Sequence, residues 1–463
     1  MLDTVLQHLA DDRAGSLRRL NEFLSIPSIS TDSAYAAHVR HGADWVAAAL
    51  GEAGFDATIH ETDGHPVVVG TSGTDGDRPG ILYYGHYDVQ PPDPVESWNS
   101  PPFEPTVRDG AVYARGASDD KGQVCCILEA LRAWKKARGD LPLPTTVLIE
   151  GEEECGSRNL PAFVERSRSL LNVGGDSRGV AVISDTTMWE GPDGPLVAIT
   201  YGLRGLLYYE LQLHGPARDL HSGMYGGTLA NPATLLTKVL GGLFDDDRRV
   251  TIPGFYDDVA PLDEDERRRW GQLHFDEKAF LGEVGVIKGY GEKDFDLLAR
   301  RWARPSCDVN GLYGGYNGEG AKTVIPRFAG AKVSFRLVPH QKPDKIAESF
   351  EAWVRSHEVD GCTWKLTHHG QAEPVVVPTE SAHLAAAVRA VETSAGHRPV
   401  LVREGATIPV VNDFKKMLGL DTLLIGFGRI NDCIHAPNEK FELNSFELGC
   451  RTHAALIAEL GNM

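Results

Sequence analysis

Residues 81–88 read Ile-Leu-Tyr-Tyr-Gly-His-Tyr-Asp, an apolar run that ends in a histidine and an aspartate. A short apolar run that stops at a glycine is typical of a buried strand. We therefore predict a strand that presents His86 at its carboxyl end, with Asp88 two residues further on. A histidine placed in this way can bind a metal ion, although most such histidines are hydrogen-bonded surface residues.

Two further apolar runs end in acidic residues. Residues 145–149 lead directly into the glutamates at 152–154, and residues 180–183 lead into Asp185. A helical pattern over residues 121–138 lies between the first strand and the second. This order predicts an α/β domain with a mostly parallel sheet, and such sheets place binding sites at the carboxyl ends of their strands.

The pattern changes near residue 200. Residues 206–213 and 332–338 alternate between apolar and polar side chains, which predicts strands with one exposed face. The α/β pattern returns in the last part of the chain. We therefore expect the first part of a catalytic metal-binding domain at residues 1–198, an inserted lid or dimerisation domain at residues 199–374, and the second part of the catalytic domain at residues 375–463.

Composition argues against several classes of protein. The 463 residues include 65 acidic and 46 basic side chains, and the resulting formal charge of −19 disfavours nucleic-acid and anionic-membrane partners. No run of about 18 apolar residues is present, so we expect no membrane span. The seven cysteines are scattered, and charged residues interrupt the first stretch of the chain. These two features predict a reduced, cytoplasmic protein without a secretory signal.

Five short segments carry side chains that Zn²⁺ and Mn²⁺ accept as ligands. They contain His86, Asp119, Glu154, Asp185 and His435. Each segment has a simpler explanation when taken alone. The aspartates at 119–120 could cap the following helix, and the glutamates at 152–154 could form a solvated acidic turn. Because the segments fall at predicted strand ends or in loops beside helices, we interpret them together as a hydrolytic metal site.

Longer motifs identify a family. They are Gly85-His86-Tyr87-Asp88-Val89-Gln90-Pro91, Arg115-Gly116-Ala117-Ser118-Asp119-Asp120-Lys121-Gly122, Glu150-Gly151-Glu152-Glu153-Glu154-Cys155-Gly156-Ser157, Asp219-Leu220-His221-Ser222-Gly223, Lys322-Thr323-Val324-Ile325-Pro326 and Arg403-Glu404-Gly405-Ala406-Thr407-Ile408-Pro409. In these motifs the sequence resembles the M20 family of metallopeptidases, and within it the dipeptidase branch. The resemblance covers nearly the whole chain. It implies a phosphorylase/hydrolase-like catalytic domain with a mostly parallel sheet, plus an inserted α+β lid or dimerisation domain.

The resemblance also implies a site for two divalent metal ions. Zn²⁺ is the first expectation, and Mn²⁺ and Co²⁺ are alternatives. His86 and Asp185 are expected to hold one ion, and Glu154 and His435 the other. Asp119 is expected to bridge the two ions.

Two further residues are expected to act in catalysis. The resemblance implies that Glu153 is the general base for a hydroxide shared by the two ions, which attacks an amide carbon. It implies that Asp88 orients the ring of His86. The peptide bond that follows Asp119 is expected to be cis.

The remaining expected site residues lie mostly in the inserted domain. The resemblance implies that His221 polarises the scissile carbonyl, commonly from a neighbouring subunit, so a homodimer is expected. Arg336 is expected to receive the substrate's terminal carboxylate, a task that suits its planar guanidinium. Thr323 and Thr407 are expected to line the pocket. The alternation around Arg336 by itself favours the other interpretation, an outward strand residue that pairs with a surface acid.

We expect a dipeptidase that acts on short peptides with a free C-terminal carboxylate. The second hypothesis is an N-acyl amino acid amidohydrolase, such as a deacetylase or desuccinylase of the same family. The third is a metal-stabilised interaction protein without catalysis, which Glu153 beside a full ligand set disfavours. The expected partners are a small peptide substrate and a second copy of the chain, with no nucleic acid and no membrane.

Overall fold

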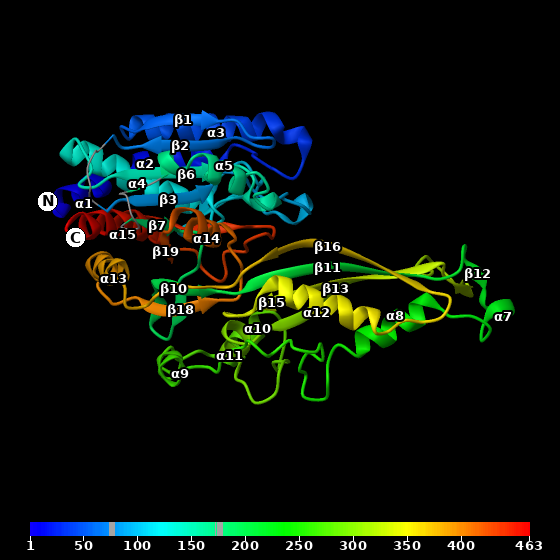
Figure 1. The fold of residues 1–463 in the computed structure, drawn as a ribbon. Helices are drawn as coiled ribbons and strands as arrows, with labels where there is room; N and C mark the ends of the chain where they lie inside the picture. The colour runs from blue at the N-terminus through cyan, green and yellow to red at the C-terminus, as the bar shows by residue number, and fades with distance from the viewer. Residues whose placement is uncertain (74–78, 172, 174–178) are drawn as a thin grey trace. The chain divides into compact units, whose positions relative to one another are not determined.

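The computed structural model describes residues 1–73, 79–171, 173 and 179–463, and these form two compact units (Figure 1). Unit 1 comprises Met1–Tyr201, Val377–Val402 and Val410–Met463, and unit 2 comprises Gly202–Val376 and Arg403–Pro409. From the sequence, divisions are expected after residues 198 and 374, and residues 403–409 are expected in the catalytic domain. The contacts of residues 403–409 instead group them with unit 2.

The helices and strands are numbered along the chain as in Figure 1. The helices of unit 1 are α1 (Leu2–Asp11), α2 (Arg13–Leu24), α3 (Ala36–Glu52), α4 (Lys121–Arg138), α5 (Leu160–Arg166), α6 (Arg168–Leu171), α13 (Ala382–Ala395), α14 (Val410–Asp413) and α15 (Leu443–Gly461). Its strands are β1 (Asp56–His60), β2 (Val67–Thr71), β3 (Ile81–His86), β4 (Thr106–Arg108), β5 (Ala111–Tyr113), β6 (Thr145–Glu150), β7 (Val180–Ile183), β8 (Trp189–Gly191), β9 (Gly194–Leu196), β10 (Ala198–Leu203), β18 (Val400–Glu404), β19 (Asp421–Gly426) and β20 (Lys440–Glu442). Short turns are η1 (Ser33–Tyr35), η2 (Val95–Ser97), η3 (Glu153–Cys155) and the π-helical η4 (Phe414–Leu418).

The helices of unit 2 are α7 (Ser222–Tyr225), α8 (Pro232–Gly241), α9 (Glu264–Gly271), α10 (Glu277–Glu283), α11 (Leu297–Trp302) and α12 (Pro343–Arg355). Its strands are β11 (Gly205–His214), β12 (Leu220–His221), β13 (Ser306–Gly314), β14 (Val324–Ile325), β15 (Phe328–Leu337), β16 (Thr363–Ala372) and β17 (Val375–Val376). Strands β10 and β18 run across the division of the chain, because the last two residues of each belong to unit 2.

Unit 1 is built on a mixed sheet with a parallel centre. The strand order is β1-β2-β6-β3-β7-β19-β10-β17, and β18 also pairs with β10. Strands β6, β3, β7 and β19 are parallel to their neighbours within this group. The flanking strands β1, β2 and β10 pair antiparallel. The parallel centre and its helices confirm the α/β class that the sequence predicts.

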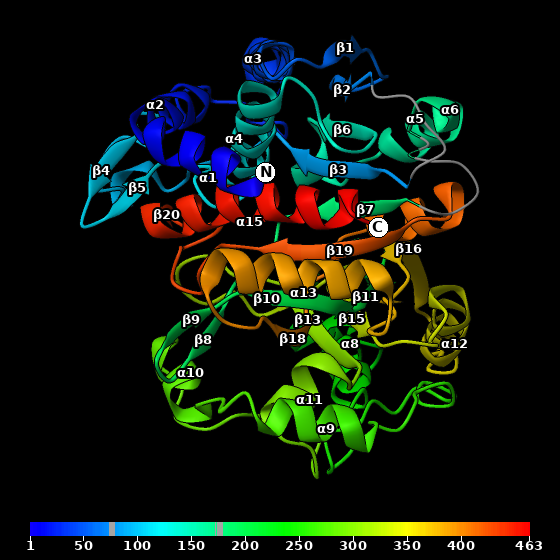
Figure 2. The same ribbon diagram turned by 90° about the vertical axis from the view of Figure 1, so that its left-hand side faces the viewer.

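Helices cover both faces of this sheet. Tyr83 and Val147, on one face, belong to a buried core that also includes residues of α3, α4, α13 and α15. Tyr84 points to the opposite face of β3 and packs edge-on against Phe414 of η4. Figure 2 shows α13 and α15 in front of the central strands. Because both faces of the sheet are covered, the central strands are buried at every position rather than at alternate ones.

Helix α4 follows the predicted boundaries and carries the chain away from the site. It begins directly after Asp120 and ends at Gly139, whose φ of 80° gives the left-handed conformation common after a helix. The first fourteen residues of α4 are buried, so the helix packs deep against the sheet and α15. This packing fixes the position of the short segment that precedes it, residues 115–120.

Unit 2 contains an antiparallel sheet in the order β13-β15-β11-β16. In β15, Phe335 faces a buried core completed by α8 and α12, whereas its neighbour Arg336 points to the other face. Strand β11 alternates in the same way along its whole length. The alternation predicted for residues 206–213 and 332–338 is therefore confirmed.

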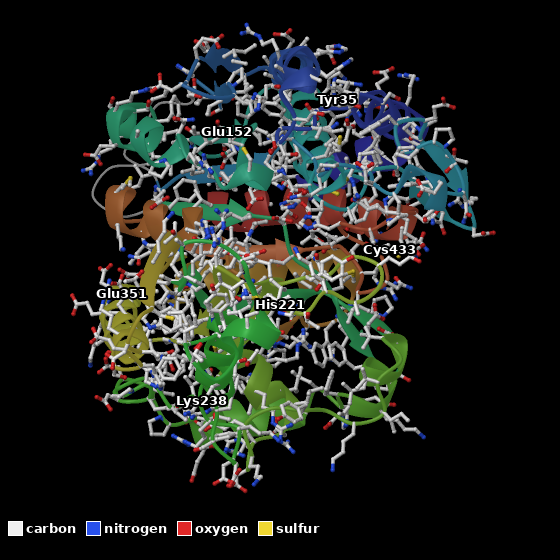
Figure 3. All side chains as sticks on the ribbon, turned by 90° about the vertical axis from the view of Figure 1, so that its right-hand side faces the viewer. Tyr35, Glu152, His221, Lys238, Glu351 and Cys433 are labelled. Carbon is white, nitrogen blue, oxygen red and sulfur yellow. The ribbon has the colours of Figure 1, made fainter. Side chains whose placement is uncertain are left out.

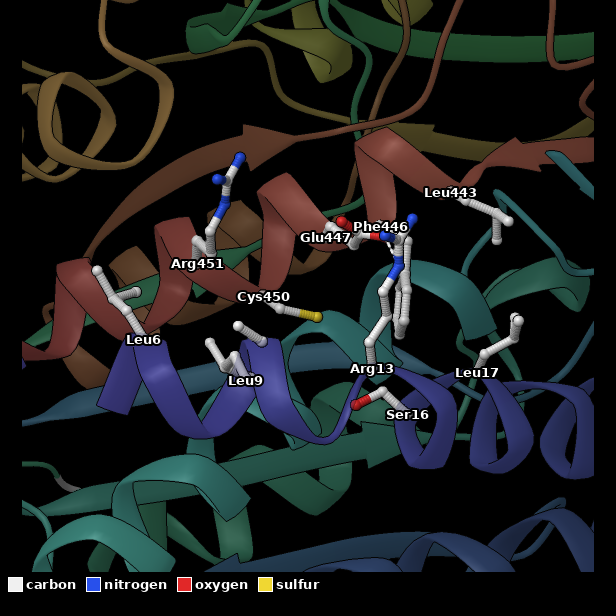
Figure 4. Close-up of a pocket in the computed structure, with 11 residues that line it drawn as sticks. Leu6, Leu9, Arg13, Ser16, Leu17, Leu443, Phe446, Glu447, Cys450 and Arg451 are labelled. Atoms are coloured by element: carbon white, nitrogen blue, oxygen red, sulfur yellow. Dashed lines mark ion pairs between the residues drawn. The ribbon is translucent and has the colours of Figure 1, made fainter. Parts of the chain in front are cut away.

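One apolar pocket of about 150 Å³ lies between α1, α2 and α15 (Figure 4). Leu6, Leu9 and Phe446 contribute apolar side chains to its lining, and Arg13 and Glu447 form an ion pair there. Its lining residues include none of the predicted site residues. In the described ranges, no helix combines the length and the apolar character that crossing a membrane requires.

Candidate metal centre

The four central strands of unit 1 bring their carboxyl ends to one edge of the sheet. His86 is the last residue of β3, and Asp185 follows β7 by two residues. Glu154 lies in η3, which follows β6, and His435 lies in the loop that follows β19. Parallel neighbours end at the same edge, so these four side chains come together from segments that are far apart in the sequence.

These side chains form two groups that share one aspartate. His86, Asp119 and Asp185 form the first group, and Asp119, Glu154 and His435 form the second. In each group the nitrogen and oxygen atoms that could bind a metal lie within 4.8 Å of one another. The structure therefore assembles all five residues that the sequence predicts as ligands.

The two oxygens of Asp119 face different groups. Oδ1 lies 3.1 Å from Nε2 of His86, and Oδ2 lies 3.0 Å from Nε2 of His435. In the first group Oδ2 of Asp185 lies 3.9 Å from the same nitrogen of His86. In the second group Oε2 of Glu154 lies 3.2 Å from Nε2 of His435. One carboxylate thus joins two adjacent sets of nitrogen and oxygen donors.

Asp88 holds both His86 and the turn that carries the glutamates. Nδ1 of His86 lies 3.1 Å from the carbonyl oxygen of Asp88 and 3.3 Å from its Oδ1. The backbone N–H groups of Glu153 and Glu154 donate to the carboxylate of Asp88 over 3.3 and 3.1 Å. Asp88 is completely buried. Its contacts leave Nε2 of His86 directed toward Asp119 and Asp185.

Glu439 fixes the segment that presents Asp119. Its buried carboxylate accepts hydrogen bonds from the backbone N–H groups of Gly116, Ser118 and Asp119, over 2.9, 2.9 and 3.1 Å. It also accepts a bond of 2.6 Å from Nη1 of Arg115. Glu439 lies in the same loop as His435, so a single carboxylate ties the two ligand-bearing segments together.

A second buried carboxylate strengthens this link. Oδ2 of Asp432 accepts hydrogen bonds from the hydroxyl of Ser118 over 2.9 Å and from the N–H of Arg429 over 2.7 Å. Burial raises the pKa of Asp432 to about 6. The bonds of Asp432 hold the loop of His435 against the segment that carries Asp119.

Gln90 orients another ligand candidate. Its Nε2 donates to Oε2 of Glu154 over 2.9 Å.

The peptide bond between Asp119 and Asp120 is cis, as the resemblance implied. Asp120 occupies the position just before α4, where the sequence suggested a capping side chain. Its side chain makes no capping bond there. Instead, Oδ2 of Asp120 accepts a bond of 3.2 Å from the backbone N–H of His86. Asp120 therefore supports the end of β3 rather than the start of the helix.

Sequence reasoning missed Glu439, Asp432 and Gln90. Glu439 follows His435 within the same loop, and Gln90 follows Asp88 in the first motif. Their proximity to predicted ligands was the available signal. It was insufficient, because the groups they bind come from remote segments and only the fold reveals the pairing.

Burial and crowding of acidic groups dominate the electrostatics. Burial, reinforced by the nearby charge of Asp119, raises the pKa of Asp185 to about 7. Burial also raises the pKa of Glu153 well above its usual range, and Asp185 and Glu154 add to this effect while His86 opposes it. Burial lowers the pKa of His86, but the neighbouring carboxylates outweigh burial and hold the pKa well above its usual value.

The donor set fits divalent cations. Nε2 of His86 is buried and, although it lies 3.1 Å from Oδ1 of Asp119, it makes no hydrogen bond of good geometry within the described part of the chain. A bound cation would use this nitrogen and would relieve the repulsion between Asp119, Asp185 and Glu154. Imidazole nitrogen with carboxylate oxygen is a ligand combination that Zn²⁺, Mn²⁺ and Co²⁺ accept.

The predicted substrate-binding residues fall into two pairs within unit 2. Arg336 donates from Nη1 to the hydroxyl of Thr407 over 2.9 Å. His221 pairs with Val324 across the β12–β14 ladder, next to Thr323. The ring of His221 is exposed, and its Nδ1 accepts a bond of 3.0 Å from the N–H of Gly223 (Figure 3). In this tautomer Nε2 carries the proton and can donate it to an acceptor.

The two pairs lie at opposite ends of the unit 2 sheet. Arg336 is near the end of β15, and His221 lies beyond the start of this strand, where Asp219 accepts a bond from the N–H of Arg327. The eight residue-to-residue steps from Phe328 to Arg336 span about 26 Å. The structure therefore does not bring His221 and Arg336 of one chain together.

A model of peptidase family M20/M25/M40 matches residues 82–459 of the chain. The chain belongs to this family. Membership confirms the resemblance on which the sequence analysis relied and makes the protein a hydrolase of the M20 metallopeptidase class. The shared Asp119 and its four partner residues lie inside the matched region.

Several relatives with named activities match most of the chain. The Cys-Gly metallodipeptidase of Candida albicans is 33% identical over 94% of this chain and 92% of its own length. The Beta-Ala-His dipeptidase of Homo sapiens is 32% identical over 86% of this chain and 78% of its own length. The crystal structure of an M20 family metallo-carboxypeptidase from Sulfolobus solfataricus is 32% identical, covers 97% of this chain and 99% of that one, and gives a TM-score of 0.86.

Replacing Glu439 by Gln should weaken metal binding. The amide keeps one acceptor oxygen but directs an NH₂ group at backbone donors, so the segment that carries Asp119 loses its hold. We expect the affinity for Zn²⁺ or Mn²⁺ to fall about 10–100-fold, the usual effect of losing a residue that orients ligands. Calorimetric titration of the chelator-stripped protein with each metal measures this change.

Glu447→Gln is the matched control, because it removes a carboxylate of the same charge from α15 without touching residues 115–119. Its affinity should equal that of the wild type. An unchanged affinity in the Glu439→Gln variant, with an intact circular dichroism spectrum, would contradict the positioning role.

Proposed function

We propose that this protein is a dipeptidase that uses two divalent metal ions to hydrolyse the amide bond of short peptides with a free C-terminal carboxylate. The observation that carries the proposal is the carboxylate of Asp119, whose two oxygens each face a separate histidine and acid. Family membership and the activities named for the dipeptidase relatives support the substrate class.

We assign His86 and Asp185 to one ion, Glu154 and His435 to the other, and Asp119 to both. When bound, such a pair of ions supplies Lewis acidity and a water nucleophile at neutral pH. Zn²⁺ is our first choice, and Mn²⁺ and Co²⁺ also suit the mixed nitrogen and oxygen donors.

We assign Glu153 the role of general base. Its backbone is fixed by Asp88, it adjoins Glu154, and its side chain belongs to neither ligand group. A carboxylate in this place can take a proton from the attacking water and return it to the leaving amine. Burial favours the protonated form of Glu153, which helps the second of these transfers.

Asp88 and Arg336 have positioning and recognition roles in this proposal. Asp88 holds the ring of His86 in one orientation, which keeps Nε2 available. Arg336 binds the terminal carboxylate of the peptide, with Thr407 fixing one of its nitrogens. His221, with Nε2 protonated, donates to the scissile carbonyl as charge develops on its oxygen, and Thr323 lies beside it.

We further propose that the active form is a homodimer. A dipeptide spans at most about 7 Å, so it cannot contact both Arg336 and His221 of one chain. His221 of the partner subunit then completes the site. Exposed apolar side chains in unit 2 support an interface, among them Met224 near His221 and Leu312 on the edge strand β13. The scattered free cysteines support a reducing, cytoplasmic setting for this dimer.

Two substitutions separate the base from the ligands. Glu153→Gln should keep both metal ions and lower kcat by at least about a hundredfold, because only proton transfer is lost. Asp119→Ala should lose metal, because its carboxylate serves both groups. Elemental analysis and steady-state kinetics on Ala-Ala measure the two effects, with the exposed Glu165→Gln as a control. Full turnover in Glu153→Gln, or full metal content in Asp119→Ala, would refute the respective assignment.

A substrate panel tests the reaction itself. The metal-loaded protein should cleave Ala-Ala, should lose this activity after chelation, and should regain it on adding Zn²⁺ or Mn²⁺. N-acetyl-alanine and Ala-Ala-Ala are the comparison substrates. Activity on N-acetyl-alanine alone would replace the proposal by the N-acyl amino acid amidohydrolase hypothesis. A preference for the tripeptide would indicate a carboxypeptidase, the activity named for the Sulfolobus solfataricus relative.

Mixing two inactive variants tests the role of the partner subunit. His221→Ala and Glu153→Gln should each be nearly inactive alone. A mixed dimer contains one site with an intact Glu153 that receives His221 from the other chain. Random exchange of subunits should therefore restore about a quarter of wild-type activity. No recovery, with exchange verified by mass spectrometry, would place the action of His221 within its own chain.

A further inference from the structure

Most well-buried arginines of this protein have a carboxylate partner. Arg115 pairs with Glu439 over 2.6 Å, and Arg304 pairs with Glu292 over 2.7 Å. Arg204 and Arg336 differ from them. Neither guanidinium has a carboxylate within 4.0 Å in the parts of the chain that the structure describes. A partly desolvated guanidinium without a counter-ion is unfavourable, so two neighbouring arginines without carboxylate partners need an explanation.

The sheet of unit 2 places these two side chains together. Ser306 of β13 is the direct partner of Arg336 of β15, so both side chains lie on the same face. Nη1 of Arg204 donates to the hydroxyl of Ser306 over 3.5 Å. Arg204 precedes β11, the strand that pairs with β15 on its other side, where Leu206 is opposite Arg336. The guanidinium of Arg204 therefore reaches across to the neighbourhood of Arg336.

The segment 403–409 holds both arginines in place. Thr407 accepts the bond from Nη1 of Arg336 and donates its own proton to the carbonyl oxygen of Arg204 over 2.7 Å. Nε of Arg204 donates to the carbonyl oxygen of Gly405 over 3.1 Å. Each guanidinium is thus anchored while retaining N–H groups that can donate to a ligand.

The surrounding charges leave this site positive. The charge of Arg301 also acts on Arg204, and the acids whose charges oppose this effect are Glu404 and Asp308. Glu404 is already engaged, because its Oε1 accepts from the N–H of Gly405 over 2.7 Å and lies 3.7 Å from Arg301. Desolvation and the charge of Arg336 lower the pKa of Arg204 to about 10. Three guanidiniums face two carboxylates, so an added anion is favoured.

We propose that Arg204 and Arg336 form one anion site in which both guanidiniums bind the C-terminal carboxylate of the peptide. The inference rests on the proposed function and adds Arg204 as a second determinant of its specificity. A carboxylate has two oxygens and about four acceptor positions, so it can receive N–H groups from both residues. Substrates whose terminus is an uncharged amide cannot neutralise the pair, and the site discriminates against them.

The test compares Ala-Ala with its C-terminal amide. Wild-type protein should show a much higher kcat/KM for the free carboxylate. Arg204→Leu should lower this preference about 10–100-fold, mostly through KM, because it removes a charge-assisted contact. Arg204→Lys keeps the positive charge but loses the planar guanidinium that can donate two parallel hydrogen bonds, and should retain an intermediate preference. Metal content and circular dichroism establish that each variant is folded and loaded.

Arg327→Leu is the matched control, since it removes an exposed guanidinium at the other end of the same sheet. The preference of this variant should equal that of the wild type. A wild-type preference in both Arg204 variants, with hydrolysis of Ala-Ala intact, would overturn the role of Arg204 and leave the proposed function standing.

A binding measurement tests the anion site independently of hydrolysis. Calorimetry on metal-loaded Glu153→Gln should give tighter binding of Ala-Ala than of Ala-Ala amide. The double variant Glu153→Gln with Arg204→Leu should lose most of that difference. If the wild type hydrolyses no peptide but this Arg204-dependent difference persists, the dipeptidase proposal fails and the anion site stands. If the double variant retains the full difference, the anion site is refuted.

Discussion

The sharing of Asp119 between two donor groups is the constraint on which the rest of the site depends. One carboxylate can serve both groups only if its two oxygens stay directed at His86 and His435, which lie far apart in the sequence. The flanking backbone must therefore be rigid. Glu439 supplies that rigidity through three backbone N–H groups, and because it lies in the loop of His435, it also fixes the separation of the two loops.

Crowding of like charge is the cost of this arrangement. Asp119, Asp185, Glu153 and Glu154 gather at one edge of the sheet, where burial and mutual repulsion raise the pKa values of Asp185 and Glu153. Such a cluster disfavours folding unless cations neutralise it. The hydrogen bonds to Asp88, Asp432 and Glu439 hold the acids in place despite their mutual repulsion. The same bonds therefore make the site rigid and keep the acids close enough to bind metal ions.

The sequence predicted the parts of the fold that short-range patterns determine. Continuous apolar runs bounded by glycine or acids marked β3, β6 and β7, and the apolar face of residues 121–138 marked α4 with its observed limits. Strand ends then placed the ligand candidates at one edge, since parallel topology leaves little choice. The division of the ligands between two ions came from the family resemblance, because each acid taken alone had an ordinary explanation as a cap or a solvated turn.

Other features depended on contacts between remote segments. Strand β13 has no clean alternation, because several of its residues are exposed at a sheet edge, and it was not predicted. The break between α1 and α2 at Asp12 interrupts what reads as one helical pattern. Arg204 carried no signal at all in the sequence. Arg204 is a candidate because it lies near Arg336 and has no carboxylate within ion-pair distance among the described residues. Only the folded sheet shows this arrangement.

The two units carry complementary chemistry, and the chemistry of a dipeptide explains why. A site rich in carboxylates binds cations well but repels the terminal carboxylate of a peptide. In our proposal that carboxylate binds instead to a separate surface of opposite charge, formed by Arg204 and Arg336 of unit 2. Placing the proposed cation site and the proposed anion site on separate units lets each be built without neutralising the other.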